Sequence, residues 1–143
     1  MADDGFNVKD LDDFTKDLLA VAQDLDKGRH SKKFLRKEGN KLKRRTKKLA
    51  NQRVKEDKGN YHKSIKRGKV YKYQGKSLSV RCYSSDNKAH LIEDGHRIVD
   101  RNNKEHGFMQ GKHVFKDAEK NFRNEFIDDC EEFIDDLLVN HGL

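Results

Sequence analysis

The C-terminal part of the chain carries the pattern that most restricts its fold. Apolar side chains recur there every three or four residues between Phe115 and Leu138, which places them on one face of a helix. Gly142 follows as a stop signal, so the sequence predicts a helix over residues 114–141. Only 33% of the 143 residues are apolar and 40% are charged, so this face holds a large share of any core. It is formed by Phe115, Ala118, Phe122, Phe126, Cys130, Phe133 and Leu137, with Ile127, Ile134 and Leu138 beside them.

Two further amphipathic helices are predicted at the start of the chain. Residues 1–30 form an acidic helix with a regular apolar stripe that stops at Gly28. Residues 31–58 form a basic helix, in which one face is apolar and the others are almost entirely Lys and Arg. Gly59 follows, where a helix end favours a residue with positive φ. The stripe of the first helix consists of Val8, Leu11, Phe14, Leu18, Val21 and Leu25, and that of the second includes Leu35, Gly39, Leu42, Thr46 and Leu49.

Residues 61–113 change to the alternating pattern of β-strands. We expect Ser64 and Ile65 to begin a sheet, with Ile65 in the core. Residues 69–73 and 78–83 then form two antiparallel strands joined by a glycine-containing turn.

The segment that follows these strands is harder to assign. Residues 89–93 fit either a third strand or a single helical turn. Residues 95–111 fit an irregular, charged loop, or a hairpin in which Ile98-Val99 and Phe108-Met109 are the paired arms.

Together these elements predict a single α+β domain over residues 1–143. It has two N-terminal helices, a small antiparallel β-sheet and a long C-terminal helix packed on the sheet. The predicted core is Leu42, Tyr71, Val80, Ile92, Phe115, Phe122, Phe126 and Phe133.

Charge is strongly segregated along the chain. The net charge is −5 over residues 1–27, +16 over residues 29–72, +2 over residues 73–113 and −6 over residues 114–143. Such asymmetry bears on partners more than on the fold. The densest cationic run consists of Lys41, Lys43, Arg44, Arg45, Lys47 and Lys48.

The basic helix admits three interpretations: a solvated surface, a contact for nucleic-acid phosphates, or a face complementary to acidic protein. The cationic run contains no aromatic residue and no known nucleic-acid motif, although nonspecific contact with DNA is expected at low salt. The acidic segments 10–17 and 128–136 favour the third interpretation. The sequence leaves open whether they face the basic helix within one subunit or between neighbours in a ring.

The histidines invite a metal hypothesis that the sequence does not favour. His90, Glu93 and His96 fall close together, and His106 and His113 follow. The sequence lacks the two histidines one helical turn apart that zinc proteases use, and Gly95 interrupts the segment. We therefore expect no metal and no other cofactor.

Enzymatic chemistry and membrane insertion have equally little support in the sequence. Neither Ser64 nor Cys82 lies in a recognised nucleophile motif, so we expect the protein not to be an enzyme. Cys82 and Cys130 are far apart in sequence, which favours reduced, partly buried thiols over the alternative of a structural disulfide. Neither a membrane span nor a secretory signal is expected.

Three short signatures occur in fixed order in the second half of the chain. The first runs from Gly59 through Tyr61 to Ser64-Ile65, and the second is the Ile92-Glu93-Asp94-Gly95 stretch. The third is Phe115 followed by Ala118 at the start of the last helix. This set resembles the tail-component family of long-tailed bacteriophages, and the resemblance runs from about residue 31 to the end of the chain.

The resemblance implies a structural protein that acts in tail completion or head-tail joining at the phage neck. Its implied partners are the connector or stopper, the tail terminator and the tail tube, and a homo-oligomeric ring is implied on assembly. It also implies a location in the virion after assembly in the bacterial cytoplasm. Glu93 is expected to anchor a turn, either by accepting hydrogen bonds or by pairing with a nearby basic side chain, and Gly95 to supply backbone freedom.

We predict that partners contact the basic helix and the segment from Gly95 to Gly111, with the latter ordering on contact. A basic nucleic-acid-binding module, linked to packaging or regulation, is the alternative function. The predicted contact residues are Lys41, Lys43, Arg44, Arg45, Lys47, Lys48, Arg97, Arg101, Lys104 and Lys112.

Overall fold

A computed structural model describes residues 8–55 and 59–143 of the chain. The fold is α+β, as predicted, with helices at the N-terminus, small antiparallel sheets and a long C-terminal helix. The helices are α1 (Val8–Asp26), α2 (Arg29–Arg53), α3 (Asn60–Ser64), α4 (Ala89–Asp94) and α5 (Val114–Asn140). The strands are β1 (Ile65–Arg67), β2 (Tyr71–Tyr73), β3 (Ser77–Ser79), β4 (Cys82–Ser84), β5 (Gly95–Val99) and β6 (Glu105–Gln110).

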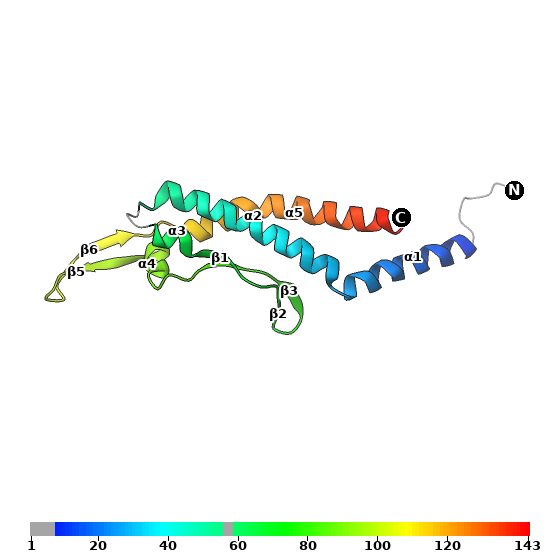
Figure 1. The fold of residues 1–143 in the computed structure, drawn as a ribbon, viewed down its shortest axis with the longest axis horizontal. Coiled ribbons are helices and arrows are strands. Elements are labelled where there is room, and N and C mark those ends of the chain that lie inside the picture. The colour runs from blue at the N-terminus through cyan, green and yellow to red at the C-terminus, as the bar shows by residue number, and fades with distance from the viewer. Residues whose placement is uncertain (1–7, 56–58) are drawn as a thin grey trace.

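The two long helices α2 and α5 lie side by side and run in opposite directions, and the strands lie on one side of them (Figure 1). Their seam is aromatic, because the Phe34 ring of α2 stacks on Phe133 and Phe126 of α5 at centroid distances of 4.6 and 6.3 Å. Phe122 is buried in the same seam at 5% exposure. The helix predicted over residues 114–141 is therefore confirmed, since its apolar face packs along α2.

Both N-terminal helices exist, with bounds that differ from the predicted ones in the described part of the chain. α1 ends at Asp26, before the predicted residue 30, and α2 begins at Arg29, two residues earlier than predicted. The basic helix ends at Arg53, where Val54 takes an extended conformation (φ −114°, ψ 113°) and its N–H still bonds to the Ala50 carbonyl at 2.8 Å. Gly28 adopts φ 72° between α1 and α2, as a chain turn requires. Residues 1–7 and 56–58 of the two predictions lie outside the described residues.

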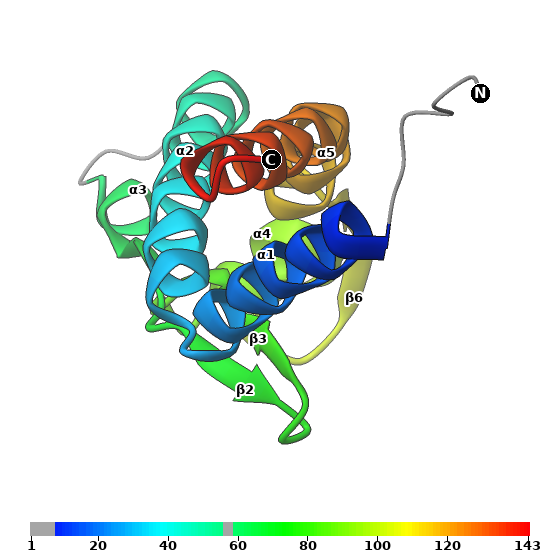
Figure 2. The same cartoon turned by 90° about the vertical axis from the view of Figure 1, so that its right-hand side faces the viewer.

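The strands form three separate two-stranded antiparallel ladders. β1 pairs with β4, β2 with β3 and β5 with β6. The first two ladders form one long ribbon, whose β2–β3 end projects away from the helices (Figures 1 and 2). Tyr71, predicted to be in the core, lies on that projecting end and is 41% exposed, so its assignment is wrong.

Candidate partner-binding surfaces

The three sequence signatures meet in one core cluster. Its fully enclosed members are Ala50 of α2, Tyr61 of α3, Ile65 of β1 and Val114 of α5. Ile65 is 1% exposed, which confirms its predicted place in the core. Around them pack the half-buried side chains of Leu49, Val54, Ala89, Ile92 and Phe115.

The first signature joins helix to strand. Gly59 has φ 64° and immediately precedes α3, so its positive φ is as predicted but it starts a helix instead of ending one. Ser64 ends α3, and its Oγ lies 2.5 Å from both the Tyr61 carbonyl oxygen and Ser84 Oγ. These bonds hold the start of the β1–β4 ladder.

Glu93 anchors the first turn of α5. Its Oε2 accepts a hydrogen bond from the Phe115 backbone N–H at 3.0 Å, and its Oε1 accepts one from Lys116 at 2.9 Å. A carboxylate in this place satisfies two otherwise unpaired N–H groups and interacts favourably with the helix dipole. The predicted hydrogen-bonding role is confirmed, although the bonds go to a helix start. Ala118, one turn further on, is 3% exposed.

Two glycines bring the strands β5 and β6 against this helix start. Gly95 has φ 88°, and a Cβ there would clash with the Met109 carbonyl oxygen. A Cβ on Gly111 would clash with the Glu93 carbonyl oxygen. The Lys112 N–H closes the base by bonding to the Ile92 carbonyl at 2.8 Å. The signatures together therefore fix the base of the β5–β6 hairpin, which we call the arm (residues 95–110).

The arm projects from the body at the end opposite α1 (Figure 1). Every residue of β6 is exposed, as are Arg97, Ile98 and Val99 of β5. Neither face of the hairpin is covered, so apolar Phe108 (53% exposed) and Val99 (56%) stand in solvent beside cations. The predicted contact residues Arg97, Arg101, Lys104 and Lys112 are all exposed on the arm or at its base.

The arm is the hairpin that the sequence offered as the alternative to an irregular loop, with Ile98-Val99 on one strand and Phe108-Met109 on the other. Hydrogen bonds hold its tip. Asp100 Oδ1 accepts from the backbone N–H groups of Asn102 at 2.8 Å and Lys104 at 2.9 Å. Its Oδ2 lies 2.8 Å from His106 Nε2, and this bond lowers the Asp100 pKa. Pairing of Arg97 with Phe108 sets the register.

The acidic and basic helices pair within one chain. Lys41 Nζ lies 2.7 Å from Asp129 Oδ2, and Arg45 is paired with Glu125. Arg53 Nη1 lies 2.5 Å from Asp117 Oδ2, and this guanidinium lowers the Asp117 pKa. Two of the predicted partner-binding residues, Lys41 and Arg45, thus form ion pairs with α5. The sequence left open whether acidic and basic segments pair within or between subunits, and for α2 and α5 they pair within one chain.

The remaining cations lie on the outer face of α2. Arg44 and Lys48 are exposed, and Lys43 and Lys47 are half-buried. Within the part of the chain that the structure describes, none of the four forms an ion pair. With the exposed Lys33, Arg36 and Lys37 they form a continuous basic stripe along α2.

A buried carboxyl group lies under the α2–α5 ion pairs and was missed from the sequence. Glu38 is 3% exposed, and its Oε2 has no hydrogen-bond partner in the described structure. Burial, then hydrogen bonding and repulsion from Asp129, raise the pKa of Glu38 from 4.5 to about 7. The bond to Lys41 lowers the Asp129 pKa. Glu38 is the sole acidic residue of α2, which carries twelve Lys and Arg. That isolation is the sequence feature that could have indicated an unusual environment for Glu38.

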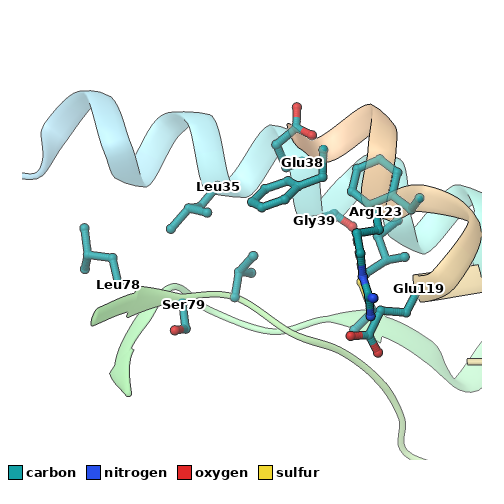
Figure 3. Close-up of a pocket in the computed structure, with 12 residues that line it drawn as sticks. Leu35, Glu38, Gly39, Leu78, Ser79, Glu119 and Arg123 are labelled. Atoms are coloured by element: carbon teal, nitrogen blue, oxygen red, sulfur yellow. Dashed lines mark hydrogen bonds between the residues drawn. The ribbon is translucent and has the colours of Figure 1, made fainter. Parts of the chain in front are cut away.

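A cleft of about 330 Å³ opens between α2, α5 and the strand ribbon. Leu35 of α2 and Leu78 of β3 face the same gap, and Glu119 and Arg123 of α5 stand at its other end (Figure 3). Leu42, Val80, Phe122 and Phe126 also line it. Leu42, Val80, Phe126 and Phe133, predicted to be in the core, are only half-buried.

The described residues show no cluster of metal-ligating side chains. No group of three or more His, Cys, Asp and Glu side chains among them is placed to hold a metal ion. Cys82 and Cys130 are free, as predicted, and burial raises the pKa of both thiols. Cys82 Sγ donates to the Gly39 carbonyl oxygen at 3.2 Å. None of the described helices is both long enough and apolar enough to cross a membrane.

Comparison of the chain with models of protein families, with curated proteins and with solved structures gives no significant match.

Proposed function

We propose that this chain is a non-enzymatic assembly protein of a long-tailed bacteriophage or prophage that acts in tail completion or head-tail joining. It works through protein contacts with connector or stopper, terminator and tube subunits, in the virion neck. The resemblance of its three signatures to the tail-component family is the starting point of this proposal. The proposal needs no cofactor and no catalytic group.

The observation that carries the proposal is the convergence of all three signatures on the base of the arm. Residues 59–65, 92–95 and 111–118 are distant in sequence, yet they build one core and hold one projecting hairpin. An exposed hairpin with apolar and cationic side chains on an anchored base is suited to insertion between other subunits. The signatures then have a common purpose, which is to present the arm.

The basic stripe favours a second candidate function, the binding of nucleic acid. Its exposed cations can contact phosphates without sequence preference. If the stripe contacts an acidic protein, the variant with both Lys47→Glu and Lys48→Glu should fold but should not assemble. Sequence preference in DNA binding that persists at physiological salt would favour the second function instead.

The test of the proposal is electron microscopy of lysates from a phage or prophage in which the gene for this chain is inactivated. We expect DNA-filled heads to accumulate apart from tails, or tails of faulty length. Normal infectious particles would overturn the proposal. Supplying the wild-type chain from a plasmid should restore joined particles, which controls for effects on neighbouring genes.

A further inference from the structure

The apolar stripe of α1 continues beyond the body of its own chain. Val21 is 7% exposed, but Leu18 (42%), Phe14 (45%) and Leu11 (53%), which follow it along the same face, are uncovered. Figure 1 shows why: α1 extends beyond the N-terminal end of α2 and away from the strands. A stripe of this size on a free-standing helix indicates a partner that covers it.

The spacing and charge of α1 define that partner. Leu11, Phe14 and Leu18 are at positions i, i+3 and i+7, the pattern with which a helix docks into an apolar groove. The helix carries six aspartates and two lysines, a net charge of −4. Two such acidic helices would repel one another. The expected partner of α1 is therefore a basic groove and not a second α1.

The cleft between α2, α5 and the ribbon has the matching properties. Its walls are apolar at Leu35, Leu42, Leu78 and Phe126. The helix α2 that forms one wall carries a net charge of +11, and residues 65–84, which form another, carry +6 with no acidic residue. The third wall, α5, carries −6, so the three walls together carry +11. No residue of α1 lines the cleft.

We propose that α1 of one copy of this chain docks in the cleft of a second copy, with Leu11, Phe14 and Leu18 against Leu35, Leu78 and Phe126. The contact joins two different surfaces, so each copy still offers a free α1 or a free cleft, and repetition gives a ring or an open filament. The inference rests on the proposed function only for its setting in a phage particle.

The experiment measures the self-association of the purified full chain by sedimentation across a concentration series. The wild-type chain should associate. Its association should weaken as the salt concentration rises, because the two surfaces are oppositely charged. Leu18→Asp should weaken association by at least about tenfold. Leu19→Asp is the matched control: Leu19 is 57% exposed on another face of α1, and its variant should associate like the wild type.

Mixing two defective variants separates this contact from a symmetric one. Leu78→Asp damages the cleft and leaves α1 intact, whereas Leu18→Asp does the reverse. Each should be monomeric alone, and their mixture should form a one-to-one dimer that grows no further. Circular dichroism and melting confirm that both remain folded.

Wild-type chain that stays monomeric up to about 1 mM would overturn the inference. So would equal loss of association in Leu19→Asp, or two variants that do not rescue each other. None of these results involves a phage lysate, so a failed contact and a failed assembly function are distinguishable.

Discussion

Replacement of Glu38 with glutamine should stabilise the protein at neutral and alkaline pH and leave it almost unchanged in acid. Glu38 is 3% exposed, and its carboxyl interacts with the carboxyl of Asp129 on α5. Its nearest cation is Lys41, whose Nζ is 3.8 Å from Glu38 Oε1 and 2.7 Å from Asp129 Oδ2. The lysine therefore pairs more closely with the half-buried Asp129 and leaves Glu38 poorly compensated as an anion.

The raised pKa of Glu38 determines how the free energy of unfolding changes with pH. Below pH 4.5 Glu38 is protonated in both the folded and the unfolded chain. Between 4.5 and about 7 the unfolded chain loses this proton while the folded chain keeps it, so the free energy of unfolding falls as pH rises. The Asp129 pKa is lowered from 3.8, so the stability that Asp129 contributes is lost only at lower pH.

The full difference between the two Glu38 pKa values corresponds to about 3 kcal/mol, and we expect about 2 kcal/mol because Lys41 can follow the new charge. Glutamine has the same shape and no charge, so Glu38→Gln should exceed the wild type by about 2 kcal/mol at about pH 8 and match it near pH 4.5.

The assay is urea denaturation followed by far-ultraviolet circular dichroism at both pH values. Glu119→Gln, which changes an exposed carboxyl of α5, is the control and should keep the pH profile of the wild type. A stability difference between Glu38→Gln and wild type that is the same at both pH values would refute the reasoning, because Glu38 would then not titrate in this window.

Three further predictions concern the arm base and the helix seam, and urea denaturation checks each. Gly95→Ala should cost at least about 2 kcal/mol through its clash with a β6 carbonyl, whereas Gly75→Ala, also at positive φ but with open space around it, should cost only about 1 kcal/mol. Glu93→Ala should cost about 1 kcal/mol, since α5 loses the acceptor for two N–H groups in its first turn; an unchanged stability would contradict the capping role. Phe122→Ala should cost about 3 kcal/mol because it opens a cavity between α2 and α5, and the exposed Ile127→Ala should change stability little; equal effects would place the seam elsewhere.

The helices were predictable because their apolar residues recur at helical spacing. The prediction for α5 agrees with the observed Val114–Asn140 almost to the residue, since one continuous stripe defines both ends. The end of α2 was missed by contrast, because Val54 leaves the helix to pack in the cluster around Ile65, which is a tertiary effect.

The strands were less predictable because each ladder is short and gains little from burial. Tyr71 has the composition of a core strand but lies where the β2–β3 end of the ribbon passes beyond the helices. The arm was predicted as an irregular loop, with a hairpin as the alternative, and the hairpin depends on bonds to Asp100 that spacing does not reveal.

The candidate contact residues also include some whose surroundings were predictable from the sequence and some whose surroundings were not. Exposure of Arg97, Arg101 and Lys104 followed from their charge and from the turn-rich segment around them. The ion pairs of Lys41 and Arg45 with α5 could not be predicted in this way. They depend on the register between two helices that lie some eighty residues apart in sequence.

The central claim, that the arm makes the contacts through which this chain acts in assembly, is tested most directly by complementation. A phage lacking the gene is supplied with the chain carrying Val99→Asp and Phe108→Asp, both on the exposed arm. Tyr73→Asp is the control, because Tyr73 is an aromatic residue that is 54% exposed at the β2–β3 end of the ribbon. With all chains verified as folded, we predict that the control restores infectious particles and the arm variant does not. Full restoration by the arm variant would contradict the claim.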